Sequence, residues 1–176
     1  MALLKPLNGR GRYHNMDARE KLERYMLNPC KAESGYIGGV NVDPDDIAGS
    51  MKRVVDHYHQ DKPHTVQLRH FVLSFPPEEL DEPAIVGEIA QQVTRHIGKD
   101  YQAVFAVHED AQNLHAHIMF NPVSYRDGHR FRGTKKEYYD LLRDTKEVLH
   151  RYGIDRLITV KASSNVDVQN ASYSEV

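Results

Sequence analysis

The sequence predicts an α+β fold with a central antiparallel sheet of about five strands and helices packed mainly on one face. Segments with strand and helix patterns are mixed along the 176 residues instead of alternating regularly. The two strongest strand patterns, residues 101–108 and 114–123, are separated by only five residues, a loop length that favours an antiparallel hairpin. A central hairpin of this kind excludes an all-parallel, doubly wound sheet.

The first half of the chain contains two helix patterns with clear ends. Asp17 suits the N-cap of the first helix, and Pro29 ends it because the residue before a proline avoids the helical region. Asp43 suits the N-cap of the second helix, with Pro44 in its first helical position. The expected elements are an irregular or strand-like start at 1–15, a helix at 16–27, a strand or hairpin arm at 35–42, a helix at 43–59 and a strand at 66–75.

The second half of the chain places the central hairpin between two further helices. Gly98 ends the first of these, whose apolar residues form one stripe. Thr134 and Glu137 form a capping-box pattern at the start of the second, and Gly153 closes it. The expected elements are a helix at 78–97, strands at 101–108 and 114–123, a short turn and strand at 125–131, a helix at 134–152 and a last strand at 154–160.

The composition is that of one globular domain, with 40% hydrophobic and 27% charged residues. We expect this domain at residues 1–160, followed by a C-terminal tail at 161–176. No apolar run approaches the roughly 18 residues of a membrane-spanning helix. The N-terminal residues do not form a secretory signal pattern, so we expect no membrane insertion and a cytoplasmic location. The single Cys30 excludes an internal disulfide and a site built on several thiolates.

Histidine is the residue type that stands out, with 11 histidines against no tryptophan. In a strand at 114–123, alternation places His115 and His117 on one face and the apolar residues between them on the core face. The hairpin folds His108 back beside this pair. Three imidazoles with an open coordination position form a catalytic metal arrangement. The alternative is a pair of surface histidines on an exposed sheet face.

The second ring nitrogen of a metal-binding histidine usually donates to a nearby acceptor. Asp110 is the first candidate for this supporting role, because it lies in the loop between the two histidine strands. Glu109 and Asn121 are the other two candidates. We therefore expect these three side chains behind the metal ligands.

The histidine pattern resembles the metal motif of the relaxases, the mobilisation nucleases of the HUH endonuclease superfamily. In this chain the motif reads His-x-Asp at 108–110, then His-x-His at 115–117, on a strand that ends in Asn121. Three further segments are similar to relaxase motifs: a tyrosine motif RYMLNPCK at 24–31, a middle motif RHFVLSF at 69–75, and a basic segment GTKKEYY at 133–139. The resemblance spans about residues 10 to 153.

This resemblance implies a metal-dependent DNA strand transferase and endonuclease with a tyrosine nucleophile. Relaxases make a site- and strand-specific nick in single-stranded DNA at an origin of transfer, form a 5′-phosphotyrosyl intermediate and rejoin the strand, in conjugative transfer or mobilisation. The tyrosine motif selects Tyr25 as the nucleophile over Tyr13 and Tyr36. The resemblance favours Mn²⁺ or Mg²⁺, whereas three imidazoles by themselves also suit Zn²⁺, Co²⁺ or Ni²⁺. Implied partners are single-stranded DNA with an adjacent hairpin, accessory DNA-processing proteins and a secretion coupling protein.

Basic and aromatic residues interleave after the histidine strand, a pattern typical of single-strand binding. The basic ones are Arg126, Arg130, Arg132, Lys135 and Lys136. Lys31, Arg10 and Arg12 are expected to add DNA contacts. For two residues of the middle motif, the sequence leaves two roles open. Ser74 contacts a phosphate or caps the following helix, and His70 lies near the site or packs inside the sheet.

Three other functions fit parts of the same pattern. A replication initiator of the same superfamily would use Tyr138 or Tyr139 as its nucleophile. A zinc hydrolase with three histidine ligands would attack a small substrate with metal-bound hydroxide and form no covalent adduct with DNA. A DNA-binding module with a structural metal would cleave nothing and would unfold on chelation.

Overall fold

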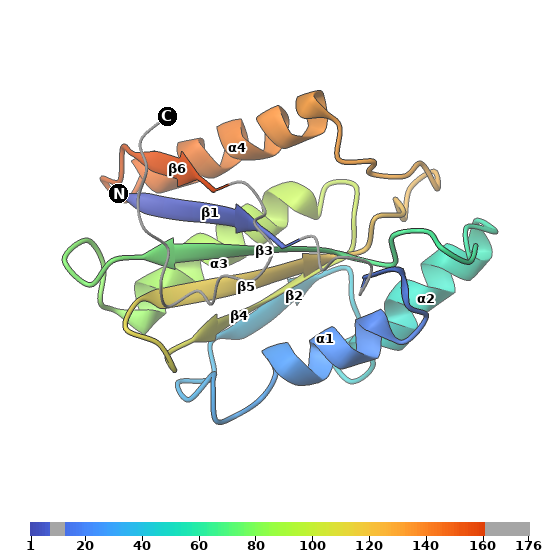
Figure 1. Ribbon diagram of the computed structural model, residues 1–176, viewed down its shortest axis with the longest axis horizontal. Coiled ribbons are helices and arrows are strands. Elements are labelled where there is room, and N and C mark those ends of the chain that lie inside the picture. Colours follow the sequence, from blue (N-terminus) through green and yellow to red (C-terminus); the bar gives the residue numbers. More distant parts are fainter. Residues whose placement is uncertain (8–12, 161–176) are drawn as a thin grey trace.

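A six-stranded sheet is the centre of the computed structural model, which describes residues 1–7 and 13–160 (Figure 1). Its strand order is β2-β4-β5-β3-β1-β6. The strands are β1 (Ala2–Pro6), β2 (Ile37–Val40), β3 (Arg69–Phe75), β4 (Ala103–His108), β5 (Leu114–Phe120) and β6 (Leu157–Thr159). The predicted α+β class is confirmed, and the sheet has one strand more than the five expected because the first residues of the chain pair with β3.

Most neighbouring strands run antiparallel, as the short central loop predicts. β4 and β5 form the expected hairpin, in which His108 lies opposite His115. On the other side of β5, Ser74 of β3 lies opposite His115 and Val72 lies opposite His117. β1 pairs with β6 in parallel at the edge of the sheet. The central strands therefore bring residues from three distant parts of the chain to one end of the sheet.

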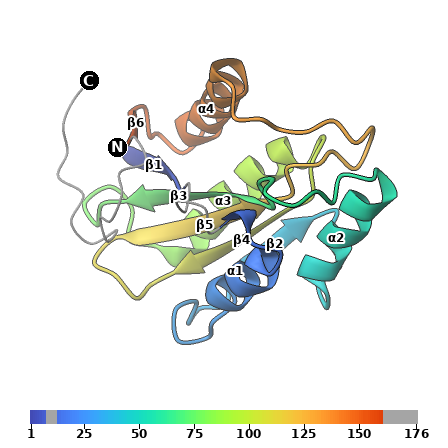
Figure 2. The same cartoon turned by 45° about the vertical axis from the view of Figure 1, so that its right-hand side comes forward.

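The four helices of the described residues cover the two faces of the sheet unequally (Figures 1 and 2). They are α1 (Ala18–Met26), α2 (Ile47–His57), α3 (Pro83–Ile97) and α4 (Lys135–His150). The two longer helices, α3 and α4, enclose the larger hydrophobic core with apolar side chains such as Phe71, Ile118 and Phe120. The prediction that helices pack mainly on one face is confirmed by this arrangement.

The shorter helices α1 and α2 cover part of the opposite face and enclose a second core. Leu22 and Met26 of α1 and Met51 of α2 pack there against Ala106 and Met119 of the sheet. Because alternate residues of β5 point to opposite faces, Met119 shares its face with the histidines of that strand. The second core therefore holds α1 against the histidine-bearing face.

The helix ends agree with the sequence patterns at α4 and differ at α2. Thr134 and Glu137 form the complete capping box at the start of α4. At α2 the predicted cap Asp43 is wrong, because Asp46 caps the helix by accepting from the Gly49 backbone N–H at 3.1 Å. The Asp43 carboxylate instead accepts from the Asp45 backbone N–H at 3.1 Å and forms a local turn before the helix.

Two other expected elements begin later or are smaller than predicted. The helix expected from residue 78 begins at Pro83. The short strand expected at 125–131 is reduced to an isolated bridge between Val123 and Arg130. Among the described residues, no helix combines the length and apolar character needed to cross a membrane.

Candidate metal centre and tyrosine site

Three buried histidines lie together at the end of the sheet where β4 finishes and β5 begins. His108, His115 and His117 each offer one ring nitrogen, and these nitrogens all lie within 4.8 Å of one another. The ring centroid of His117 is 4.4 Å from that of His108 and 5.1 Å from that of His115. The structure thus brings the three predicted metal ligands to one focus.

Each of these imidazoles uses its other nitrogen in a hydrogen bond that points away from the focus. His108 Nε2 donates to the Met26 carbonyl at 2.9 Å, and His115 Nδ1 donates to the Asn113 carbonyl at 3.0 Å. His117 Nδ1 lies 2.8 Å from His70 Nε2. His108 Nδ1 and His117 Nε2 are buried and have no hydrogen-bond partner among the described residues. Buried nitrogens of this kind fit a bound cation, because coordination would satisfy them.

Burial also favours the form of histidine that binds metals. It lowers the pKa of His108 and His115, and it lowers the pKa of His117 well below the ordinary value. A protonated imidazole has no free electron pair for a cation, whereas the neutral ring has one. The three residues therefore match the donor set of a divalent metal site with imidazole ligands.

Tyr25 lies on the solvent side of the histidine cluster. Its ring centroid is 5.3 Å from that of His117 and 5.5 Å from that of His108, and 42% of the residue is exposed. Tyr25 is on the last turn of α1. The residue after it, Met26, is buried, and its carbonyl accepts the hydrogen bond from His108. The packing of α1 on the second core thus fixes the phenol beside the candidate ligands.

The turn after α1 places Lys31 beside both Tyr25 and the histidine loop. The Lys31 ammonium lies 5.2 Å from the centroid of the Tyr25 ring and forms an ion pair with Asp110. The hydrogen bond to Asp110 raises the pKa of Lys31. Burial opposes ionisation of Asp110, but the hydrogen bond and charge of Lys31 hold the pKa of this carboxyl below its usual range. A positive charge therefore lies next to the phenol.

None of the three side chains predicted to support the ligands is the hydrogen-bond partner of an outward-pointing ligand nitrogen among the described residues. Asp110 pairs with Lys31, and its Oδ1 lies 4.0 Å from His115 Nε2, the nitrogen that faces the cluster. Glu109 accepts from the Ser34 backbone N–H at 2.9 Å. Asn121 lies at the far end of β5 and donates to the Met51 carbonyl at 3.0 Å. Two backbone carbonyls and His70 take the supporting places instead.

The sequence left open whether His70 lies near the site or packs inside the sheet, and the structure shows both. It is buried inside the sheet, with 4% of the residue exposed, and it also contacts the candidate ligand His117. Its Nδ1 lies 2.7 Å from the Tyr13 hydroxyl. Burial lowers the pKa of His70 to about 3. The alternation of β3, with Phe71 and Leu73 in the larger core, already indicates that His70 shares a face with the histidines of β5.

Ser74 is buried on β3 directly opposite His115. It does not cap the following helix, because α3 begins at Pro83. Tyr36, a rival nucleophile in the sequence, packs against Gly87, where an added Cβ would lie 3.2 Å from the tyrosine side chain. Tyr36 is therefore held by α3, which lies on the face opposite the histidines.

The basic segment after β5 lies at the end of the sheet where β5 finishes, away from the end where β5 begins (Figure 1). His115 is near the start of β5 and Phe120 is its last residue, a span of about 17 Å at the usual rise per residue. Arg130 donates to the Val66 carbonyl at 2.7 Å and the Gln60 carbonyl at 3.1 Å, so its guanidinium binds the loop between α2 and β3. The segment follows the histidine strand in sequence but leaves it at the end away from the histidines.

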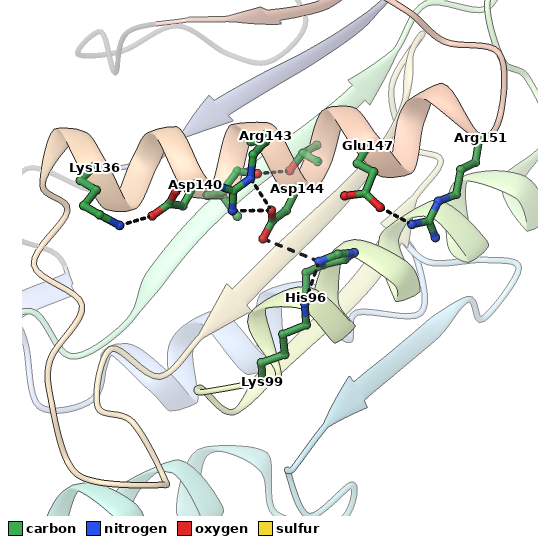
Figure 3. A network of polar contacts seen from close by, with 10 residues as sticks. His96, Lys99, Lys136, Asp140, Arg143, Asp144, Glu147 and Arg151 are labelled. Carbon is green, nitrogen blue, oxygen red and sulfur yellow. Dashed lines mark hydrogen bonds and ion pairs between the residues drawn. The ribbon is translucent and has the colours of Figure 1, made fainter.

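Two other basic side chains of this segment have acidic partners. Arg126 lies 3.4 Å from Asp100, and Lys136 lies 2.8 Å from Asp140 in a row of ion pairs along α4 (Figure 3). The same network connects α4 to α3 through Asp144 and His96. Arg132 and Lys135 are exposed. Arg10 and Arg12 lie outside the described residues.

Comparison with known proteins gives a family match over most of the chain. Residues 25–154 match the family model described as "Relaxase: MobA/VirD2-like, nuclease domain". Protein rlx of Staphylococcus aureus is 28% identical over 111 residues, which cover 63% of this chain and 34% of that protein. The group II intron-interrupted relaxase LtrB of Lactococcus lactis subsp. cremoris is 32% identical over 72 residues, 40% of this chain and 13% of that protein.

A solved structure described as "Molecular Basis of Vancomycin Resistance Transfer in Staphylococcus aureus" aligns with a TM-score of 0.45 and 18% identity. The alignment covers 73% of this chain and 74% of that one. The matched part spans about a third of the rlx protein and a smaller share of LtrB. Because the family match covers well over half of its residues, the chain belongs to the MobA/VirD2-like relaxases as a nuclease domain.

Proposed function

We propose that this chain makes a site- and strand-specific nick in single-stranded DNA at an origin of transfer and rejoins the strand, with Tyr25 as the nucleophile. One observation carries the proposal: an exposed phenol lies beside three buried imidazoles, and two of these have a nitrogen at the common focus with no partner in the described part of the chain. Membership of the relaxase family supports the same activity. Residues 1–160 are the proposed nuclease domain.

The proposed step exchanges one phosphodiester for another. The Tyr25 hydroxyl oxygen attacks the scissile phosphorus, the bond from phosphorus to the 3′ oxygen breaks, and the 5′ phosphate stays on the tyrosine. The phenol proton is lost and the departing 3′ oxygen gains a proton, so no ATP is needed and rejoining is the reverse reaction. His108, His115 and His117 would hold a divalent cation, which would supply positive charge to stabilise the non-bridging phosphate oxygens.

The chain's own residues supply binding and orientation. α1 holds the phenol at the cluster, and the nearby Lys31 ammonium favours negative charge on the Tyr25 oxygen as it attacks. Arg132 and Lys135 are exposed candidates for contacts with the DNA backbone farther from the nick. We propose Mn²⁺ or Mg²⁺ as the working ion, a hairpin next to the nick as part of the substrate, and accessory and secretion coupling proteins as partners in the cytoplasm.

The position of α4 argues against the replication-initiator alternative. Tyr138 packs near Phe131, with ring centroids 5.9 Å apart, on the side of the larger core. Tyr139 is 71% exposed on the same helix. Because α4 covers the face opposite the histidines, neither phenol lies beside the candidate ligands.

The test uses labelled single-stranded DNA from the chain's own genetic element, with Mn²⁺, and a denaturing gel. We expect a covalent protein–DNA adduct that is lost on chelation and in Tyr25→Phe. The matched control is the double variant Tyr138→Phe/Tyr139→Phe, which should keep the adduct. Cleavage without an adduct would support a hydrolase, and an adduct that survives Tyr25→Phe would move the nucleophile elsewhere.

A further inference from the structure

A chain of three side chains, two of them buried and the third half-buried, runs behind one of the candidate ligands. His117 on β5 contacts His70 on β3, and His70 contacts Tyr13, which precedes α1. The two links are 2.8 Å between His117 Nδ1 and His70 Nε2, and 2.7 Å between His70 Nδ1 and the Tyr13 hydroxyl. The His70 and His117 rings are 5.0 Å apart with an angle of 30° between their planes. Both ring nitrogens of His70 are therefore engaged, one toward the cluster and one away from it.

The direction of these hydrogen bonds decides whether His117 can bind a cation. If Tyr13 donates to His70 and His70 donates to His117, the proton of neutral His117 lies on Nε2 and blocks coordination. In the opposite direction, His117 donates from Nδ1 to His70, and His70 donates from its own Nδ1 to the Tyr13 oxygen. The second arrangement leaves His117 Nε2 unprotonated toward the focus.

His117 differs from the other two candidate ligands in the kind of acceptor behind it. His108 and His115 donate to backbone carbonyls, which can only accept and therefore fix the ring proton by themselves. His117 faces a second imidazole, which can donate or accept. Its tautomer and ring orientation thus depend on side chains that substitution can change.

We infer that His70, oriented by Tyr13, is a positioning residue that holds His117 in the tautomer and orientation needed to bind the cation. A purely packing role for His70 would not require both of its nitrogens to be in line with polar partners at hydrogen-bond distance. The inference rests on the metal-binding part of the proposed function, and it does not depend on which tyrosine attacks DNA.

The first measurement is the affinity for Mn²⁺ by isothermal titration calorimetry on the full chain without DNA. His70→Phe keeps a planar ring but removes the acceptor, so we expect Mn²⁺ binding to weaken by roughly 10- to 100-fold. His70→Gln restores an amide oxygen that can accept from His117, and we expect it to recover part of the affinity. Tyr13→Phe should weaken binding less, because it removes only the outer link.

The matched control is Leu73→Ala, a fully buried change on the same strand whose side chain faces the larger core. Thermal unfolding in the presence of chelator checks that each variant is folded. We expect Leu73→Ala to lower stability while leaving the Mn²⁺ affinity of the folded chain unchanged. If His70→Phe binds Mn²⁺ as tightly as the wild type, the positioning role of His70 is overturned. The same result would still support the proposed metal site.

The second measurement needs no variant, so it tests the role of His70 even if His70→Phe does not fold. Nuclear magnetic resonance of the Zn²⁺-loaded wild type identifies the protonated nitrogen of each imidazole. We expect protons on Nδ1 of both His117 and His70. A proton on His70 Nε2 would overturn the inference, and a wild-type chain that binds neither Mn²⁺ nor Zn²⁺ would overturn the proposed metal site together with it.

Discussion

The ring of Tyr25 stands edge-on to the ring of His117, with centroids 5.3 Å apart and an angle of 84° between the planes. Tyr25 is 42% exposed, whereas His117 is 2% exposed. A phosphodiester that approaches the histidine cluster from solvent therefore meets the phenol and the candidate ligands together.

Lys31 and Asp110 are expected to act on the reaction as a pair. The ammonium lies next to the Tyr25 ring and favours the negative charge that develops on the attacking oxygen, so a loss of about 1 kcal/mol of transition-state stabilisation in Lys31→Met should slow adduct formation by roughly fivefold. Asp110→Asn should also slow it, and the double variant should show a smaller loss than the product of the two. Single-turnover rates of adduct formation measure this coupling.

The control for that cycle is the exposed ion pair of Lys52 and Asp56 on α2, 2.8 Å apart. Its removal should leave the rate unchanged, because exposed pairs contribute little and this one lies outside the site. Strictly multiplicative effects of Lys31→Met and Asp110→Asn would show that the two residues act independently.

Binding of Mn²⁺ should stabilise the folded chain through the histidine cluster. At a free Mn²⁺ concentration of about 100 times Kd, the gain is about 2.7 kcal/mol, which raises Tm by roughly 5–11 °C for a chain of this size. Differential scanning calorimetry with and without Mn²⁺ measures the shift. His115→Ala should remove it, whereas His57→Ala, an exposed change on α2, should keep it. A full shift in His115→Ala would place the binding site elsewhere.

The metal-free chain should lose stability on acidification. Burial lowers the pKa of His70 to about 3, while the unfolded chain titrates near the ordinary value of 6.5. Below pH 6.5 the unfolded state therefore binds a proton that the folded state does not, so the free energy of unfolding falls as the pH drops from 6.5 toward 3. The slope from this group is about 1.4 kcal/mol per pH unit.

Urea unfolding in chelator at several pH values measures this slope. His108, His115 and His117 act in the same direction, because burial lowers the pKa of each. His70→Gln should flatten the dependence. An equal slope in wild type and His70→Gln would mean that His70 is not buried as a neutral ring.

Much of the candidate site follows from simple rules applied to the sequence. Alternation along β5 predicts that His115 and His117 share a face, and a loop of five residues predicts the hairpin that brings His108 opposite His115. Both rules depend only on local geometry, and the structure agrees with them. The position of Tyr25 came from resemblance to a motif, because no local pattern predicts where α1 docks.

The parts that the sequence did not predict depend on contacts between distant segments. The acceptors for His108 and His115 are backbone carbonyls of Met26 and Asn113, and any residue type supplies a carbonyl. Asp110 is adjacent to the ligands in sequence, but the charge of Lys31 draws its carboxylate to the turn after α1. β1 pairs with β6 from the other end of the chain, which no local pattern indicates.

The most direct test of the central claim is to locate the DNA remnant on the protein after nicking. The adduct is trimmed with nuclease, digested with trypsin and analysed by mass spectrometry. Cleavage after Arg24 and Lys31 releases Tyr25 in the peptide YMLNPCK, whereas Tyr138 and Tyr139 fall in EYYDLLR. We predict a phosphonucleotide on YMLNPCK, formed with Mn²⁺ and lost on chelation. A remnant on EYYDLLR would contradict the account.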